Sequence, residues 1–136
     1  MKIMAIDYGD ARTGVAFSDI TERLASPYTV ISEKYQPRLI DKLCEIIKKE
    51  NAEKLIVGLP RNMDGSYGFR ADACREFAQA IAESSGLPVE LQDERLTTVI
   101  AHSVLSENNV RGKKRKEVVD AVSAVMILQS YLDKNN

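Results

Sequence analysis

The sequence predicts an α/β fold: a mixed five-stranded sheet in the order 3-2-1-4-5 with helices on both faces. Two apolar runs near the N-terminus are joined by only five residues, which indicates a hairpin with an antiparallel second strand. Farther along, short apolar runs alternate with amphipathic stretches, a pattern typical of parallel strands linked by helices. Right-handed crossovers then place the fourth strand beside the first. The 136 residues are expected to form one domain over residues 1–136.

The first three strands are predicted at Lys2–Tyr8, Gly14–Asp19 and Ser26–Ser32. The third contains Pro27, which has no N–H to donate to a neighbouring strand. Pro27 is therefore expected either in an edge strand or at the start of a strand. The remaining strands are short apolar runs at Lys54–Gly58 and Val89–Gln92.

Four helices are predicted from apolar residues that recur every three or four positions, which is the period of an amphipathic helix. Their expected ranges are Pro37–Glu50, Phe69–Ser84, Thr97–Glu107 and Arg115–Leu132. The second should bury one face consisting of Phe69, Ala73, Phe77 and Ile81. The last should bury Val118, Ala121, Val122, Val125, Leu128 and Leu132.

Composition limits the possible functions. The chain is 44% hydrophobic and 29% charged, with a net charge of −1, so it lacks the strongly basic character of many nucleic-acid-binding domains. Any nucleic acid must therefore bind to a local basic patch. Cys44 and Cys74 lie far apart at apolar helix positions, which favours buried free thiols. No stretch approaches the roughly 20 apolar residues of a membrane span, and we expect a cytoplasmic protein.

Carboxylates at the edges of core elements are the strongest functional signal. Asp7 ends the first strand, which is apolar on both faces, and Asp93-Glu94 follows the last predicted strand. Asp120 shares a helical stripe with the apolar Ala124, Ile127 and Tyr131. Such carboxylates suit a site for hard divalent cations, as in two-metal phosphoryl chemistry. In the predicted topology, Asp7 and Asp93-Glu94 meet at the carboxyl ends of the strands, where ligands bind.

Each acid also has an ordinary structural explanation. Asp7 could open a turn, and Asp93-Glu94 could be a polar loop before a helix. Asp120 could be a first-turn acid that the helix dipole stabilises. The only histidine, His102, lies in the middle of a predicted helix, which does not favour a serine or cysteine triad.

Two segments are candidates for binding phosphate. The loop Leu59–Gly68 leads into a helix N-terminus, where free N–H groups favour anions, and Val110–Glu117 is the only dense basic run. A solvated loop and a solvated linker are the respective alternatives. The candidate nucleic-acid-binding residues are Arg12, Arg61, Arg70, Arg95, Arg111, Lys113, Lys114, Arg115 and Lys116. The candidate phosphate-loop residues are Gly9, Gly58, Asn62, Gly65, Ser66 and Gly68.

Several motifs resemble those of the YqgF family, also called RuvX. They are Asp7-Tyr8-Gly9 with Arg12, Val57-Gly58-Leu59-Pro60, Met63-Asp64-Gly65-Ser66, Asp93-Glu94-Arg95-Leu96-Thr97-Thr98 and Asp120-Ala121. The resemblance covers nearly the whole chain and implies a ribonuclease H-like fold. It also implies a nuclease that matures the 5′ end of precursor 16S ribosomal RNA, while resolution of Holliday junctions is the older proposal for the family.

The resemblance further implies a metal-binding triad of Asp7, Asp120 and one acid of the Asp93-Glu94 pair. In the wider superfamily the second carboxylate commonly lies on the fourth strand, which here ends at Gly58. We expect the fifth strand to supply it, through Glu94 because of its longer reach, with Asp93 as the alternative. The expected cofactors are two Mg²⁺ or Mn²⁺ ions bridged by Asp7.

Other functions remain open from the sequence. Actin-like ATPases and sugar kinases share the Asp-x-Gly motif, but they bind nucleotide between two such domains. A non-catalytic RNA-binding factor of ribosome assembly would also suit the weak overall charge. The sequence does not decide between RNA and a DNA junction. It identifies no dimer surface, although symmetric cleavage of a junction usually requires a dimer.

Overall fold

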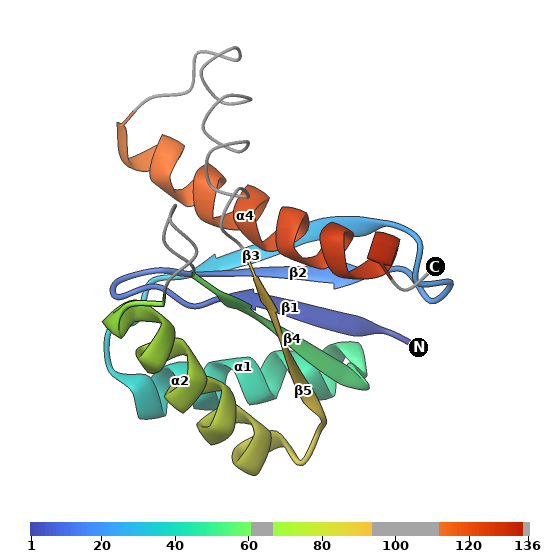
Figure 1. Cartoon of the computed structure of the whole chain (residues 1–136), viewed down its shortest axis with the longest axis horizontal. Coiled ribbons are helices and arrows are strands. Elements are labelled where there is room, and N and C mark those ends of the chain that lie inside the picture. Colours follow the sequence, from blue (N-terminus) through green and yellow to red (C-terminus); the bar gives the residue numbers. More distant parts are fainter. Residues whose placement is uncertain (61–66, 94–111, 135–136) are drawn as a thin grey trace.

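The computed structural model describes residues 1–60, 67–93 and 112–134, and within the last range it describes side chains from residue 122 onward. Its sheet has the order β3-β2-β1-β4-β5, as predicted (Figure 1). Strand β2 pairs antiparallel with both β1 and β3, and β4 pairs parallel with β1 and β5. The strands are β1 (Ile3–Asp7), β2 (Thr13–Ser18), β3 (Ala25–Ile31), β4 (Lys54–Leu59) and β5 (Val89–Asp93).

Helices α1 (Gln36–Glu50) and α2 (Phe69–Ser85) cover one face of the sheet, and α4 (Gly112–Lys134) crosses the other (Figure 1). Both α1 and α2 end at a residue with a left-handed backbone, Asn51 with φ 58° and Gly86 with φ 73°. A left-handed residue satisfies the last helical carbonyls and stops the helix. The predicted helix at Thr97–Glu107 lies outside the described residues.

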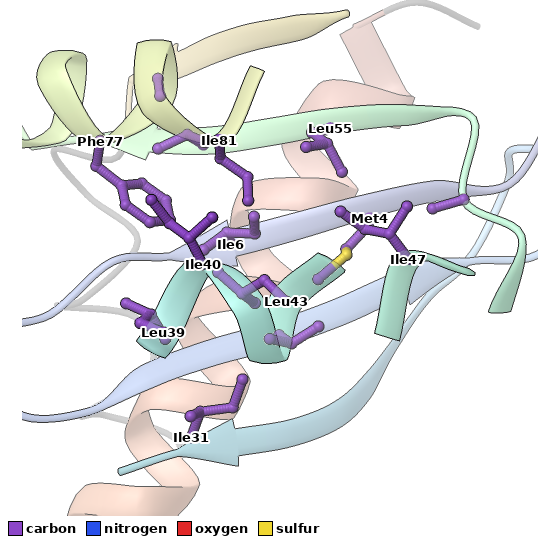
Figure 2. Packing of buried hydrophobic residues seen from close by; sticks show 14 of the residues in the cluster. Met4, Ile6, Ile31, Leu39, Ile40, Leu43, Ile47, Leu55, Phe77 and Ile81 are labelled. Atoms are coloured by element: carbon purple, nitrogen blue, oxygen red, sulfur yellow. The ribbon is translucent and has the colours of Figure 1, made fainter. Parts of the chain in front are cut away.

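Alternation along the strands separates two apolar cores. Met4 and Ile6 of β1 pack with Leu55 of β4 and with the buried residues of α1 and α2 (Figure 2). Ile3 and Ala5 point to the opposite face and pack against α4. Because successive strand residues point to opposite faces, β1, β2 and β4 each contribute buried residues to both cores. Both faces of the central strand are therefore buried, as its unbroken apolar run predicts.

The buried face of α2 differs from the prediction. The structure buries Ala71, Cys74, Phe77, Ala78 and Ile81. Phe69 was assigned to this face but is 82% exposed. A step of four residues advances about 40° beyond a full turn. Two such steps therefore place Phe69 about 80° around the helix from Phe77.

The last helix begins at Gly112 rather than at the predicted Arg115. Residues 112–117 of the basic run are therefore helical, which does not favour the linker alternative, and Val110 and Arg111 lie outside the described residues. Of the predicted buried residues, Leu128 and Leu132 are buried, while Val122 and Val125 are half-buried. Val118 and Ala121 lie outside the described side chains. No helix among the described residues has the length and apolar character needed to cross a membrane.

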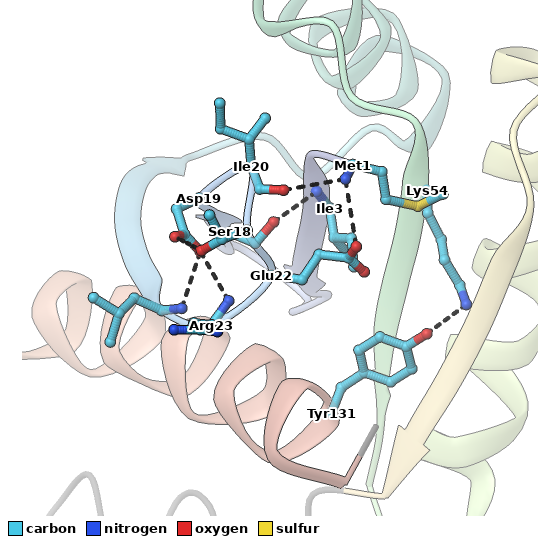
Figure 3. A network of polar contacts seen from close by, with 11 residues as sticks. Met1, Ile3, Ser18, Asp19, Ile20, Glu22, Arg23, Lys54 and Tyr131 are labelled. Carbon is cyan, nitrogen blue, oxygen red and sulfur yellow. Dashed lines mark hydrogen bonds and ion pairs between the residues drawn. The ribbon is translucent and has the colours of Figure 1, made fainter. Parts of the chain in front are cut away.

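Polar contacts hold together the end of the sheet where β1 begins (Figure 3). The N-terminal ammonium group donates to the carbonyl of Ile20 at 3.2 Å, and the Ile3 N–H donates to Ser18 Oγ at 2.9 Å. Lys54 donates to the Tyr131 hydroxyl and pairs with Glu90 at 2.8 Å, which joins β4, β5 and α4. Both interactions raise the pKa of Lys54, the Glu90 contact most. This end is the opposite one from Asp7.

Candidate functional site

Asp7 is half-buried at the carboxyl end of β1 and lies on the face that α4 covers. It shares this face with Ile3 and Ala5, which pack against α4. Tyr8 packs on the other face, where its ring stacks on Phe77 with centroids 4.2 Å apart. The stacked tyrosine anchors the chain beyond β1, and alternation then directs the carboxylate of Asp7 toward the α4 face.

Asp7 has a glycine beside it on each neighbouring strand. Gly14 of β2 is its direct partner, and the parallel register Ile6↔Val57 continues to Gly58 of β4. Neither glycine carries a side chain. Neither neighbouring strand therefore places a side chain directly beside Asp7 on this face.

Helix α4 runs from the Asp7 end of the sheet toward the Lys54 end, where Tyr131 meets Lys54. Asp120 precedes Tyr131 by about three helical turns, or about 16 Å along the axis. Lys54 pairs with Ile3, and Asp7 lies four strand residues farther along, a span of about 13 Å. The backbone of α4 at Asp120 therefore lies close to the level of Asp7 along the strands. Ala124, Ile127 and Tyr131, on the same stripe, are buried, as the sequence predicts.

Asp93 ends β5 on the opposite face from Asp7. It pairs with Leu59, and Val89, at the same parity, packs against the α1 and α2 core. Its carboxylate accepts hydrogen bonds of 3.1 and 3.3 Å from the Tyr67 hydroxyl. Asp93 therefore links the start of α2 to the end of β5, and its position does not favour a shared ion with Asp7.

Arg70 binds the chain that follows Asp7. Its guanidinium donates to Asp10 Oδ1 at 2.6 Å and to the Tyr8 carbonyl at 2.7 Å. The sequence predicted a phosphate contact for Arg70, whereas the structure shows it fastening the first turn of α2 to the loop between β1 and β2. Burial raises the pKa of Tyr8, and the charge of Arg70 opposes that rise.

The loop after β1 requires a glycine at position 9, because the backbone of Arg12 passes very close to it. A Cβ atom at this position would lie 2.2 Å from the carbonyl oxygen of Arg12, which is far inside van der Waals contact. Arg12 is half-buried beside it. The glycine thus allows the tight connection that follows Asp7, in addition to the phosphate role predicted for it.

Several predicted site residues cannot be placed. Arg61, Asn62, Gly65, Ser66, Glu94, Arg95 and Arg111 lie outside the described residues. The structure gives only backbone positions, all within α4, for Lys113, Lys114, Arg115, Lys116 and Asp120. Gly68 is the N-cap of α2. Among the described side chains, no group of three acidic, histidine or cysteine residues is arranged to hold a metal.

Sequence reasoning missed two aromatic residues at this end of the sheet. Tyr67 is 41% exposed and binds Asp93, and Phe69 is 82% exposed at the first position of α2. The aromatic spacing around Gly68 was visible in the sequence. The four-residue repeat assigned Phe69 to the core instead.

Comparison with known proteins identifies the family. The family model described as "RuvX: Holliday junction resolvase" matches residues 1–134. The chain belongs to the RuvX family. It is thus a member of a nuclease family, and the predicted resemblance is confirmed over nearly its whole length.

Relatives of similar length carry one printed name, "Putative pre-16S rRNA nuclease". That of Halothermothrix orenii is 46% identical over 136 residues, covering 100% of this chain and 97% of the relative. That of Listeria monocytogenes is 44% identical and covers 100% of both chains. That of Pelotomaculum thermopropionicum is 43% identical, covering 98% of this chain and 87% of the relative.

Solved structures confirm the ribonuclease H-like resolvase fold. The fowlpox virus resolvase in complex with Holliday junction DNA superposes with a TM-score of 0.62 at 13% identity, covering 99% of each chain. RuvC of Thermus thermophilus in complex with a Holliday junction superposes with a TM-score of 0.61 at 14% identity. It covers 100% of this chain and 97% of RuvC.

Proposed function

We propose that this protein is a divalent-metal-dependent nuclease of the cytoplasm that hydrolyses phosphodiester bonds during 5′-end maturation of precursor 16S ribosomal RNA. The observation that carries the proposal is Asp7, a carboxylate at the carboxyl end of the central strand, with Gly14 and Gly58 beside it and α4 over the same face. The names of the full-length relatives support RNA as the substrate.

In this proposal the metal ligands are Asp7, Glu94 and Asp120. Asp7 and Asp120 belong to elements that meet on one face of the sheet. Asp93 lies on the other face, and Glu94 is the next residue, so we assign the second carboxylate to Glu94. Two Mg²⁺ or Mn²⁺ ions, when bound, would activate a water and stabilise the departing oxygen.

The remaining residues would hold the strand. In the sequence, Arg12 follows β1, and the predicted phosphate-binding residues Arg61, Asn62, Gly65 and Ser66 follow β4. Arg95, Arg111 and the basic residues of α4 would neutralise the phosphates on either side. Arg70 holds the Tyr8–Asp10 segment through two hydrogen bonds, and it stays a proposed phosphate contact. These contacts would bind the phosphate backbone of the nucleic acid and would not distinguish one base sequence from another.

The decisive experiment compares the wild type with Asp7→Asn on labelled RNA that carries a precursor 5′ end. Reactions contain Mg²⁺, Mn²⁺ or a chelator. Asp41→Asn, an exposed acid on α1 across the sheet, is the matched control. We expect metal-dependent cleavage by the wild type and the control, and its loss in Asp7→Asn while the circular dichroism spectrum is unchanged. Cleavage that survives in Asp7→Asn would rule out the assigned site.

Junction resolution is the second candidate, because the matching family model is described as a Holliday junction resolvase. A synthetic four-way DNA junction, tested beside the RNA, separates the two. Cleavage of the junction alone would favour the resolvase. Symmetric cutting should then coincide with a dimer in sedimentation analysis. RNA binding without cleavage of either substrate would instead indicate a non-catalytic assembly factor, or an enzyme that needs a ribosome-assembly partner.

A further inference from the structure

The start of α2 presents an aromatic side chain to solvent. Phe69 is 82% exposed, although the face of α2 that it was expected to join is buried. A single exposed apolar residue needs no explanation by itself. The position of Phe69 does need an explanation. Phe69 immediately precedes Arg70, whose hydrogen bonds attach α2 to the chain that follows Asp7.

The contacts of its neighbours place Phe69 beside the proposed active site. Arg70 holds Asp10 at 2.6 Å and the Tyr8 carbonyl at 2.7 Å, so the first turn of α2 lies against the loop that follows β1. On the other side of Gly68, the Tyr67 hydroxyl binds Asp93 at the end of β5. The segment that carries both aromatic residues therefore spans the carboxyl ends of the sheet.

Positive charge accompanies these rings. The guanidinium of Arg75 lies 4.9 Å from the centroid of the Tyr67 ring. Arg75 is 43% exposed and pairs with the exposed Asp72 at 3.0 Å. Tyr67 is itself 41% exposed. Exposed aromatic faces next to arginine are what single-stranded nucleic acid needs, because unpaired bases stack on the rings while the cations attract the backbone. In a duplex the bases stack on one another and their faces are not available.

We propose that Tyr67 and Phe69 form a stacking platform for unpaired bases beside the catalytic site. The substrate that this site accepts is then single-stranded where it passes α2. This inference rests on the proposed nuclease function and narrows its substrate class. Phe69, the more exposed of the two rings, makes the principal stacking contact, and Tyr67 is held in place by Asp93 and Arg75.

The test measures binding by fluorescence anisotropy, with a labelled oligouridylate and with a blunt RNA duplex of equal length, in chelator. Phe69→Ala should weaken binding of the single strand by about 5- to 150-fold, the range found for loss of one base–aromatic stack. Duplex binding should not change. Phe69→Trp should retain single-strand binding, and Phe69→Leu should lose it because leucine has no aromatic face.

Ile20→Ala is the matched control, since Ile20 is 79% exposed but lies at the opposite end of the sheet. Full binding by Phe69→Leu, or equal losses on single strand and duplex, would overturn the stacking platform. So would a change in sedimentation for Phe69→Ala with RNA binding intact, which would instead identify a protein interface. Cleavage of precursor RNA by the wild type is scored separately. Stacking without cleavage rejects only the nuclease, and cleavage without dependence on Phe69 rejects only the platform.

Discussion

Asp7, the last residue of β1, and Tyr8, which follows it, point to opposite faces of the sheet. Tyr8 enters the α2 side, where it stacks on Phe77 and accepts a hydrogen bond from Arg70 through its carbonyl. Asp7 consequently faces α4. The same parity argument applies to β5, where Asp93 lies on the α2 side and bonds to Tyr67. Asp93 therefore lies on the sheet face opposite Asp7, and Glu94 lies outside the described residues.

This distinction predicts different results for two neutral substitutions. Glu94→Gln should abolish metal-dependent cleavage, because it removes a proposed ligand. Asp93→Asn should retain cleavage, since Asp93 lies on the other face, where its carboxylate accepts hydrogen bonds from Tyr67. Cleavage of precursor RNA and Mn²⁺ affinity by calorimetry would both be measured. Loss of Mn²⁺ affinity in Asp93→Asn, with Glu94→Gln unaffected, would reverse the assignment.

Asp19 is an acid with a structural role at the opposite end of the sheet. It accepts hydrogen bonds from the Thr21 hydroxyl and from the N–H groups of Leu24 and Arg23, at 3.1 and 2.9 Å. These bonds lower its pKa from 3.8 to about 2, with the Thr21 bond contributing most. A pKa lowered by folding means that the carboxylate stabilises the fold above the unfolded pKa. That stabilisation is lost as the pH falls toward 2.

We therefore expect Asp19→Asn to lower the midpoint of urea unfolding at pH 7. The difference from the wild type should shrink between about pH 4 and pH 2, as the wild-type carboxylate becomes protonated. Asp41→Asn, at an exposed position on α1, provides the control for the change in charge. A difference that stays constant over this pH range would contradict a charge-dependent role for Asp19.

At the scale of elements, one side chain attaches α4 to the edge of the sheet. Gln129 accepts a hydrogen bond of 3.0 Å from the Ala25 N–H and donates one of 2.9 Å to the Arg23 carbonyl. These bonds begin β3, the edge strand that contains Pro27. The same helix carries Asp120, so this attachment helps to fix the position of α4 along the sheet.

Gln129→Leu should destabilise the protein by about 1–3 kcal/mol, because the two hydrogen bonds to the start of β3, of roughly 0.5–1.5 kcal/mol each, are lost. An exposed hydrogen bond to Asp133 is lost as well. Chemical denaturation measures the change, and hydrogen exchange at the Ala25 amide should become faster. Gln79→Leu on α2 is a suitable comparison, since that side chain makes only a 3.5 Å bond to Glu83 among the described contacts. Equal effects of the two substitutions would show that Gln129 does not anchor α4.

The elements show where sequence reasoning succeeds and where it stops. The strand order follows from a short hairpin and right-handed crossovers, and the structure confirms it. Pro27 identified the edge strand correctly because a missing N–H is a local property. The buried face of α2 was wrong at Phe69, since a four-residue repeat drifts around the helix. Helix α4 includes residues before the predicted Arg115, although a glycine within a run of like charges favours a mobile segment.

For the molecule as a whole, the site depends on pairing that no single segment reveals. Asp7 was visible in the sequence as an acid after an apolar run. Its glycine neighbours, Gly14 and Gly58, became apparent only from the register of β2 and β4. Arg70 was assigned to phosphate from its place beside a loop and a helix N-terminus. Its link to Asp10, 60 positions away, could not be inferred from the sequence. Long-range contacts of this kind leave no periodic signal in a sequence.

Charge is distributed unevenly over a chain whose net charge is only −1. The first turn of α4 contains no acid, and its basic residues lie at the positive end of the helix dipole. That arrangement is unfavourable unless an anion is bound nearby, which supports a phosphate contact at this position. Lys34, Lys48 and Lys49 are exposed on and beside α1, across the sheet from α4. These three lysines carry the same total charge as Lys113, Lys114 and Lys116 but lie on the other side of the sheet.

Salt dependence separates these two groups of cations. Replacing Lys113, Lys114 and Lys116 with glutamine should flatten the plot of log affinity against log salt by about 2, because each contact with single-stranded phosphate contributes about 0.7. The same change at Lys34, Lys48 and Lys49 should leave the slope unaltered. Both variants are titrated with single-stranded RNA in the Asp7→Asn background, where cleavage cannot interfere. Equal slopes in the two variants would mean that RNA responds only to total charge, and that α4 does not guide the strand toward Asp7.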